Sequence, residues 1–487
     1  MEDMRRMHLF TSNSRKIGKT VAALMILTGV ILLFLINVFA KTWRPRENLY
    51  YFYQLEKNSL DVINIGSSHV HSSINTVRMY EQEGISSYNL SAGSQPIWYS
   101  YYYLKEALKT QTPKVIILDV YTLSNTNDDD YIAKAQLNLL TMKPSYDKWE
   151  ALRVSGTDDM ISLFLGFPKN HARYRELTSK EYDDKVCLNM MGYAYTGNTE
   201  PLDKDSVLNA GSISDTAPIS AKAEEYLRKT IELCREKDIA IVLVNAPWPN
   251  IQQEDAERYN YVGQIAEEYG VDFIDGCDMS EQIGIDYRTD NAGDNGHLNY
   301  RGSLKWTNYL MQYLSDNYSL PDHRPEHPLI WEESVRELDN MLARDHLEGI
   351  ENADEYLNYL SDKPGYAYAV IVDSDLPLPN TTKLLLEKTG LELGDAENGY
   401  LIRMPNGQTY SGVDFASDTR MFSDMYDKIN TYEEKDEEYH FLKMQFNKRI
   451  ADERTEKDIY FIVFDPFRNS ALDTAEFRED EGYKRNI

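Results

Sequence analysis

The hydrophobic pattern begins with one long apolar run and continues with many short ones. Residues 20–40 carry no charged side chain, and as a helix this run of 21 residues spans about 30 Å of hydrocarbon. This length favours an uncleaved transmembrane anchor. Small residues ahead of Lys41 leave a cleaved signal peptide as the alternative. Both readings place the body of the chain outside the cytoplasm.

After a Tyr-rich juxtamembrane stretch at residues 41–60, short apolar runs alternate with helical periodicity. Leu227, Ile231 and Cys234 recur at helical spacing, and a final helix is predicted over residues 300–314. The runs that predict buried strands lie at residues 61–67, 87–90, 114–123, 239–244 and 271–274. Apolar strands that alternate with amphipathic helices indicate a parallel sheet covered on both faces. The sequence therefore predicts a three-layer α/β/α domain over residues 61–319.

Residues 124–218 interrupt the alternation of strands and helices. They open with an acidic polar loop and continue with scattered aromatic residues and prolines. One interpretation is an insertion that covers the carboxyl ends of the strands, where open α/β sheets bind ligands. The other is a helical decoration without contact to such a site.

The chain beyond residue 319 predicts a separate unit. Residues 320–344 form a proline-broken linker followed by helical periodicity. Within residues 345–487, apolar strands are predicted at 366–372, 399–404 and 459–464, with a helix at 381–389. This mixture predicts a small C-terminal α+β accessory domain.

Charge separates the start of the chain from the rest. The net charge is −28, while residues 1–46 carry eight basic and two acidic side chains. Five of the basic residues precede the apolar run, which predicts that residues 1–19 are cytoplasmic. The remaining residues hold 43 basic and 77 acidic side chains, a balance of −34. Such a body excludes nucleic-acid binding, which needs basic surfaces, and favours a neutral or weakly charged polysaccharide over an anionic polymer.

The cysteine content excludes two further classes of protein. The chain has only three cysteines, Cys187, Cys234 and Cys277, and none form a CxxC pair. A disulfide scaffold and a cysteine-rich zinc site are therefore excluded. We expect neither a metal nor a cofactor.

The first chemistry-bearing segment is IGSSHV at residues 65–70. A strand that ends in Gly66-Ser67-Ser68 puts a hydroxyl at the carboxyl edge of the sheet, just before a helix. A serine nucleophile needs such an exposed hydroxyl, with N–H donors nearby for an oxyanion. A helix N-cap is the alternative for the same residues.

The second segment is DNGHLNYRGS at residues 294–303. Asp294, three residues ahead of His297, can accept from one imidazole nitrogen and leave the other free as a general base. The alternatives are a loop cap and a metal pair, which would need a third ligand that the sequence does not show.

Together the two segments resemble the SGNH (GDSL-type) esterase and acyltransferase superfamily over residues 61–317. The first sequence block of the family is Gly-Asp-Ser. The last block is Asp-x-x-His, and it is followed by Leu or Phe, then Asn, and then a Gly. The resemblance implies that Ser68 is the nucleophile and that Asp294 and His297 are its partners. It also implies that the N–H groups of Ser68 and Gly93 are the oxyanion donors. Gly93 lies in the segment that matches the family's second block. The positions that match the last block are Asp294, His297, Leu298, Asn299 and Gly302.

The sequence departs from the family pattern at two places. Serine stands at position 67, where the family has aspartate, and the third block, Gly-x-Asn-Asp, has no match in residues 119–125. Asn245 follows a later strand and is not its equivalent by order. The side-chain oxyanion donor is therefore not identified.

The Gly-Ser-Ser variant with an N-terminal anchor resembles the branch that includes the D-alanyl transfer protein and the alginate O-acetylation proteins. This implies an acylesterase or O-acyltransferase of the cell envelope that works on a surface polysaccharide, often beside a polytopic membrane-bound O-acyltransferase. An acyl group would pass through Ser68 to a glycan hydroxyl or to water. The alternative is a non-catalytic glycan-binding or scaffold partner of such a membrane enzyme.

Three further features carry expectations of their own. The C-terminal residues 345–487 resemble an interleukin-like EMT-inducer domain, which implies an accessory role. His69 and His71 are interpreted as polar residues at the start of a helix. The aromatic run Trp98, Tyr99 and 101–103 is interpreted as the core of its helix, with sugar stacking as the alternative.

Overall fold

The computed structural model describes two compact units, Met1–Leu338 and Asp339–Ile487. In the first, it describes residues 17–34, 48–166, 190–202, 207–294 and 296–338. In the second, it describes residues 339–363, 366–373, 378–391, 398–403, 409–412, 421–422, 429–436, 439–446, 449–454, 458–465, 470–478 and 484–485.

The predicted apolar segment is a helix over Ile17–Phe34, with a mean hydropathy of 2.2. Its length and composition suit a membrane anchor or a signal sequence, and the last part of the predicted span, residues 35–40, lies outside the described residues. The predicted cytoplasmic tail before residue 17 also lies outside them.

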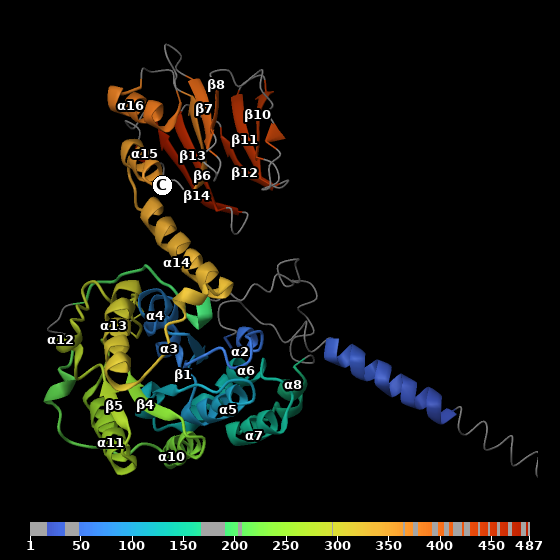
Figure 1. Ribbon diagram of the computed structural model, residues 1–487, viewed down its shortest axis with the longest axis vertical. Helices are drawn as coiled ribbons and strands as arrows, with labels where there is room; N and C mark the ends of the chain where they lie inside the picture. Colours follow the sequence, from blue (N-terminus) through green and yellow to red (C-terminus); the bar gives the residue numbers. More distant parts are fainter. Residues whose placement is uncertain are drawn as a thin grey trace, which may run out of the picture. The chain divides into compact units, whose positions relative to one another are not determined.

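The first unit is built on a five-stranded sheet in the order β2-β1-β3-β4-β5, and all its neighbouring pairs are parallel. The predicted three-layer α/β/α fold is confirmed (Figure 1). The strands are β1 Val62–Gly66, β2 Ser87–Ser91, β3 Val115–Asp119, β4 Ala240–Asn245 and β5 Asp272–Asp275. The strand order reverses direction around β1, and ligands of open α/β sheets bind beside the carboxyl ends at such a point.

Alternate strand residues face opposite layers of helices, as the pleat requires. Ile63 and Ile65 belong to the larger core, with the helices α5 Ile97–Ala107, α10 Ala221–Glu236 and α11 Gln253–Tyr269. Val62 belongs to the core on the other face, with α4 Thr76–Glu83 and α13 Tyr300–Asn317. The two layers lie on either side of the sheet in Figure 1.

One strand is shorter than the sequence predicts. The apolar run over residues 114–123 gives β3 only as far as Asp119, and the 3-10 helix η1 Tyr121–Ser124 follows. The reason is a side chain: the Asp119 carboxylate accepts a hydrogen bond from the Tyr121 N–H at 3.1 Å, which turns the chain out of the sheet.

The segment before β1 packs into this unit. The short helix α2 Asn48–Phe52 buries Leu49, Tyr51 and Phe52 in the larger core. The amide of Asn48 donates to Ser91 Oγ at 3.1 Å. Part of the stretch interpreted as juxtamembrane therefore belongs to the folded core.

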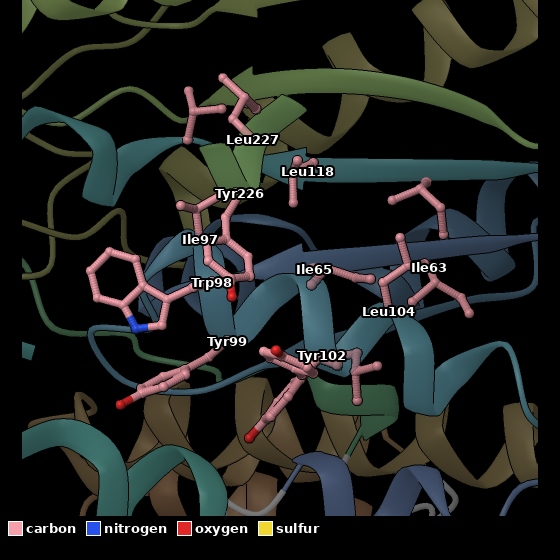
Figure 2. Packing of buried hydrophobic residues seen from close by; sticks show 14 of the residues in the cluster. Ile63, Ile65, Ile97, Trp98, Tyr99, Tyr102, Leu104, Leu118, Tyr226 and Leu227 are labelled. Carbon is pink, nitrogen blue, oxygen red and sulfur yellow. The ribbon is translucent and has the colours of Figure 1, made fainter. Parts of the chain in front are cut away.

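The aromatic run at the start of α5 is core, as interpreted from its spacing. Trp98, Tyr99 and Tyr102 pack with Ile65 and Leu118 (Figure 2). Trp98 is 2% exposed and Tyr99 is fully buried. These rings are therefore not available to stack on a sugar.

The remaining elements of the first unit are short. In the insertion they are η2 Asp128–Lys134, α6 Ala135–Leu139, α7 Tyr146–Ser155, α8 Met160–Leu165 and η7 Ala210–Ser212. Elsewhere they are α3 Ser68–Ser73, α12 Ser280–Ile283, η8 Arg324–Glu326 and the start of α14 Leu329–Glu348. Cys187 lies outside the described residues.

The second unit is the predicted small α+β domain. A six-stranded sheet in the order β15-β14-β13-β6-β7-β8 has antiparallel neighbours throughout and buries Val370, Phe461 and Phe477 against α15 Ala353–Ser361 and α16 Asn380–Thr389. Its strands are β6 Ala367–Asp373, β7 Asn398–Arg403, β8 Thr409–Gly412, β13 Asp458–Asp465, β14 Ser470–Arg478 and β15 Lys484–Arg485. A second sheet holds β9 Met421–Phe422, β10 Ile429–Asp436, β11 Tyr439–Phe446 and β12 Arg449–Arg454.

Candidate active site

The two serines after β1 have different roles in the local structure. Ser67 is the N-cap of α3, and its hydroxyl accepts a hydrogen bond from the His69 N–H at 3.2 Å. Ser67 is fully buried, whereas Ser68 is partly exposed. The N-cap that the sequence offered as an alternative to a nucleophile is therefore Ser67, and the hydroxyl of Ser68 remains available for chemistry.

Asp294 and residues 296–299 form a hydrogen-bonded turn before α13. Asp294 Oδ1 accepts from the backbone N–H groups of Gly296 and His297, at 3.1 and 3.0 Å. Asn299 is the N-cap of α13 and accepts from two N–H groups of its first turn. The turn therefore holds Asp294 and His297 in a defined mutual orientation at the carboxyl edge of the sheet.

Ser68, His297 and Asp294 form one continuous chain of polar contacts. His297 Nε2 lies 2.7 Å from Ser68 Oγ, and His297 Nδ1 lies 2.5 Å from Asp294 Oδ2. Burial opposes ionisation of Asp294, but the hydrogen bonds from His297 outweigh it and hold the pKa of this carboxyl below its usual value. The ionised Asp294 accepts a hydrogen bond from Nδ1–H, which leaves Nε2 to accept a hydrogen bond from the Ser68 hydroxyl.

His69 lies closer to this site than the sequence indicated. Its ring stacks on Tyr121 with centroids 3.5 Å apart, and it lies 5.1 Å from the ring of His297. Burial, together with the neighbouring His297 and His71, lowers its pKa well below 6.5. His69 lies in the first turn of α3, as interpreted from the sequence, and its neutral ring is also an aromatic neighbour of the site.

Tyr121 and Trp248 are aromatic residues of the site that the sequence did not single out. Trp248 meets Tyr121 edge-on at 5.2 Å and His69 at 6.1 Å. Both follow the carboxyl ends of strands, Tyr121 after β3 and Trp248 after β4. Because these ends meet at one edge of a parallel sheet, the position after each strand was a signal that could have found them.

Asp119 is the other site neighbour that the sequence missed. It is the last residue of β3, is 3% exposed, and its carboxylate accepts from both the N–H and the hydroxyl of Ser67. It lies where the third sequence block was expected, but it contacts the first block. No motif carries this signal, because the partner, Ser67, follows another strand of the sheet.

The two other residues considered for an oxyanion donor differ in position. Gly93 follows β2 by two residues, and its carbonyl accepts from Asn138 Nδ2 at 3.3 Å. Its N–H as an oxyanion donor stays a prediction. Asn245 is fully buried at the end of β4, where its amide donates to Asp275 at 2.9 Å. This hydrogen bond joins the carboxyl ends of the neighbouring strands β4 and β5.

The insertion contains both kinds of structure that the sequence allowed. The helix α7 packs on α5, away from the catalytic turn. By contrast, the carbonyl of Thr196 accepts from the Tyr300 N–H at 2.8 Å, and Asn299 Nδ2 donates to Thr199 Oγ1 at 2.9 Å. The later part of the insertion therefore supports the turn that carries His297.

Within the described residues, no group of three or more His, Cys, Asp and Glu side chains is arranged to hold a metal ion. Cys234 and Cys277 are buried free thiols.

Comparison with known proteins finds similarity among solved structures only. No family model matches the chain, and no curated protein matches it. A GDSL-like lipase from Bacteroides thetaiotaomicron is 9% identical, with 57% of this chain and 98% of that chain covered and a TM-score of 0.30. A catalytic mutant of an acetylxylan esterase from Geobacillus stearothermophilus is 12% identical, with 54% and 96% covered and a TM-score of 0.28. Identity and TM-score are both low, so the assignment of chemistry depends on the geometry of Ser68, His297 and Asp294.

Proposed function

We propose that this chain is a serine-dependent acyl-transfer enzyme of the SGNH type that acts outside the cytoplasm on esters of a cell-surface glycan. The observation that carries the proposal is the chain of contacts from Ser68 Oγ through His297 to Asp294, at 2.7 and 2.5 Å. The nucleophile follows the first strand and the histidine precedes the last helix of the sheet domain. A surface ion pair or a helix cap would not need the third member, Ser68.

The proposed reaction has two displacements through one covalent intermediate. Ser68 Oγ attacks the ester carbonyl while His297 Nε2 takes its proton, and Asp294 stabilises the imidazolium. The tetrahedral intermediate collapses, and the leaving alcohol takes the proton from His297. An acceptor hydroxyl or water then attacks the acyl-enzyme and gives its proton to His297. The new ester or acid leaves as Ser68 recovers that proton.

Developing charge on the carbonyl oxygen needs nearby donors. The proposal assigns the backbone N–H groups of Ser68 and Gly93 to this role. Loss of one oxyanion donor typically reduces the rate about 10²–10³-fold.

Location and charge support the choice of substrate. The apolar helix Ile17–Phe34 follows basic residues, which suits an anchor with a cytoplasmic N-terminus. The acidic body disfavours close approach to an anionic polymer. We therefore assign a neutral or weakly charged polysaccharide as the acceptor or ester substrate, and a membrane-bound O-acyltransferase as the partner that would supply the acyl group.

The test is acetyl transfer by the full-length chain in detergent micelles. The protein is given an aryl acetate as donor and a neutral polysaccharide as acceptor, and both free acetate and polysaccharide-bound acetate are measured. The proposal expects acetate release or transfer that Ser68→Ala and His297→Ala abolish. His323→Ala is the matched control, because His323 Nε2 also contacts a carboxylate, Asp61, at 2.7 Å but does not contact Ser68.

The product identifies the reaction. Polysaccharide-bound acetate means transfer, and free acetate alone means hydrolysis. Polysaccharide binding without release of acetate, unchanged in Ser68→Ala, would replace the proposal with the non-catalytic binding or scaffold role.

A further inference from the structure

Asp119 and Ser67 join the ends of two neighbouring strands directly beside the proposed nucleophile. We infer that Asp119 is the positioning residue of this serine, acting through Ser67, and that it takes the place of the aspartate that Ser67 replaces in the Gly-Asp-Ser pattern. The inference rests on the proposed function, since it names a residue that this reaction would require. It assigns no substrate contact to Asp119.

The contacts of the carboxylate use both of its oxygens. Asp119 Oδ2 accepts from the Ser67 N–H at 3.0 Å and from the Ser67 hydroxyl at 2.6 Å. Asp119 Oδ1 accepts from the Tyr121 N–H at 3.1 Å. Hydrogen bonds to an ionised acceptor are roughly twice as strong as neutral ones, so one carboxylate fixes the backbone after β1 and the backbone after β3.

Burial of Asp119 makes these three donors necessary. The side chain is 3% exposed, and a buried carboxylate without partners is costly. Burial raises the pKa of Asp119 above its usual value, and the hydrogen bonds from Ser67 and Tyr121 offset this only in part. The carboxylate and its donors are therefore interdependent.

Close packing between Gly66 and Asp119 excludes any side chain at position 66. A Cβ added at Gly66 would lie 2.3 Å from the Asp119 Cβ and 2.8 Å from Asp119 Oδ2. Real Cβ atoms do not approach this closely, so only glycine lets the turn close over Asp119. The glycine of the motif and the carboxylate from β3 form one packed unit immediately ahead of Ser68.

Ser67 transmits this constraint to the residues around His297. Its hydroxyl donates to Asp119 and at the same time accepts from the His69 N–H. The His69 ring stacks on Tyr121, whose N–H Asp119 also holds, and lies 5.1 Å from the His297 ring. Ser68 lies between these fixed residues, so a shift of the turn would move Ser68 Oγ relative to His297 Nε2. A misplacement of about 1 Å can cost on the order of 10² in rate.

Exchanging the residue types at positions 67 and 119 tests the inference directly. Exchanging the two residues, to give Asp at 67 and Ser at 119, keeps the same pair of side chains between the two backbones. The exchanged pair therefore has the same number of side-chain atoms to bridge this distance as the natural Ser67 and Asp119. The variants of the full-length chain are Asp119→Asn, Ser67→Asp and the double exchange Ser67→Asp/Asp119→Ser. Asp61→Asn is the matched control, because Asp61 adjoins the other end of β1 and accepts from Ser86 Oγ at 2.8 Å.

Two measurements separate positioning from folding. The first is steady-state kinetics with an aryl acetate, which gives KM and kcat. The value of kcat is expressed per active serine, as counted by titration with a fluorophosphonate. The second is hydrogen exchange of the backbone over residues 66–70, which needs no turnover. We expect Asp119→Asn to lower kcat per titrated site about 10–100-fold, with KM within about threefold, and to speed exchange at 66–70. The double exchange should recover at least about tenfold over Ser67→Asp, and Asp61→Asn should stay within about twofold of the wild-type kcat.

The inference is overturned if Asp119→Asn keeps kcat per titrated site within about twofold of wild type. A double exchange no more active than Ser67→Asp also contradicts it, as does unchanged exchange at 66–70 in Asp119→Asn. A wild-type chain that neither reacts with the fluorophosphonate nor turns over instead overturns the proposed function, and the exchange measurement then still decides whether Asp119 holds the turn.

Discussion

His297 Nε2 lies 2.7 Å from Ser68 Oγ, although 229 positions separate the two residues in the chain. The parallel sheet makes this contact possible, because the turn after β1 and the turn before α13 both lie at its carboxyl edge. The contact to Asp294 completes the arrangement within one four-residue segment. The following predictions depend on this geometry.

The first prediction concerns the carboxylate. Asp294→Asn retains the size of the side chain but cannot hold a proton on His297 Nδ1 in the required tautomer, so kcat should fall about 10³–10⁴-fold. Steady-state kinetics with an aryl acetate measure the loss. Asp322→Asn is the control, since Asp322 is an exposed carboxylate paired with Arg324, and it should leave kcat unchanged. Equal activity of the two variants would contradict the role of Asp294.

The second prediction concerns the other histidine of the site. His69 is 2% exposed, its Nδ1 lacks a partner, and burial holds its pKa well below 6.5. Burial disfavours the imidazolium that a general base becomes when it accepts a proton, so His69 is a weaker base than His297, whose Nε2 contacts the Ser68 hydroxyl. His69→Phe keeps an aromatic ring on Tyr121 and should retain kcat within about threefold, whereas His297→Ala should lose nearly all of it. A loss in His69→Phe as deep as that in His297→Ala would mean that the base is misassigned.

Much of the fold could be predicted because it depends on periodic apolar patterns. The five apolar runs predicted for the sheet domain all form strands. The segments that carry Ser68 and His297 meet at the carboxyl edge of that sheet. Asp119 was missed for a physical reason. Its function depends on a contact to Ser67, 52 positions away, and its own neighbours in sequence read as the continuation of an apolar strand.

The aromatic residues show the same limit. The sequence drew attention to Trp98 because it belongs to a run of five aromatic residues, but helical spacing placed that run in the core. Trp248, alone after β4, lies beside His69. The run of aromatic residues around Trp98 indicated a core helix, whereas the position of Trp248 after a strand indicated a residue near the site.

The third prediction tests the core role of Trp98. Trp98→Ala should destabilise the sheet domain by about 3–5 kcal/mol, because the ring is almost fully buried and leaves a cavity. KM should not change in the folded enzyme, since the ring is buried in the core. Urea unfolding followed by circular dichroism measures the first effect. Trp149→Ala, at a side chain that is 41% exposed, is the control and should cost clearly less. A raised KM with unchanged stability would assign Trp98 to substrate binding.

The fourth prediction concerns stability against pH. Asp275 is buried at the end of β5, and burial, followed by repulsion from Asp278, raises its pKa to about 7 from 3.8. Between these values the unfolded chain has released a proton that the folded chain retains, so stability falls as the pH rises through this window. The loss approaches about 4 kcal/mol and levels off above about pH 7. Asp275→Asn should flatten this slope.

Tryptophan emission is suited to this measurement. All six tryptophans lie before residue 339, so the signal reports unfolding of the first unit alone. The free energy of unfolding is measured in urea at several pH values for wild type and Asp275→Asn. Parallel curves for the two proteins between about pH 4 and about pH 7 would contradict the assignment of the slope to Asp275.

The most direct test of the central claim is the site of covalent reaction. The full-length chain in detergent is treated with a fluorophosphonate, digested, and analysed by mass spectrometry. We predict a single adduct on Ser68, absent in Ser68→Ala, strongly slowed in His297→Ala, and formed at the wild-type rate in His323→Ala. An adduct on another residue, or labelling of Ser68 at the same rate without His297, would contradict the account.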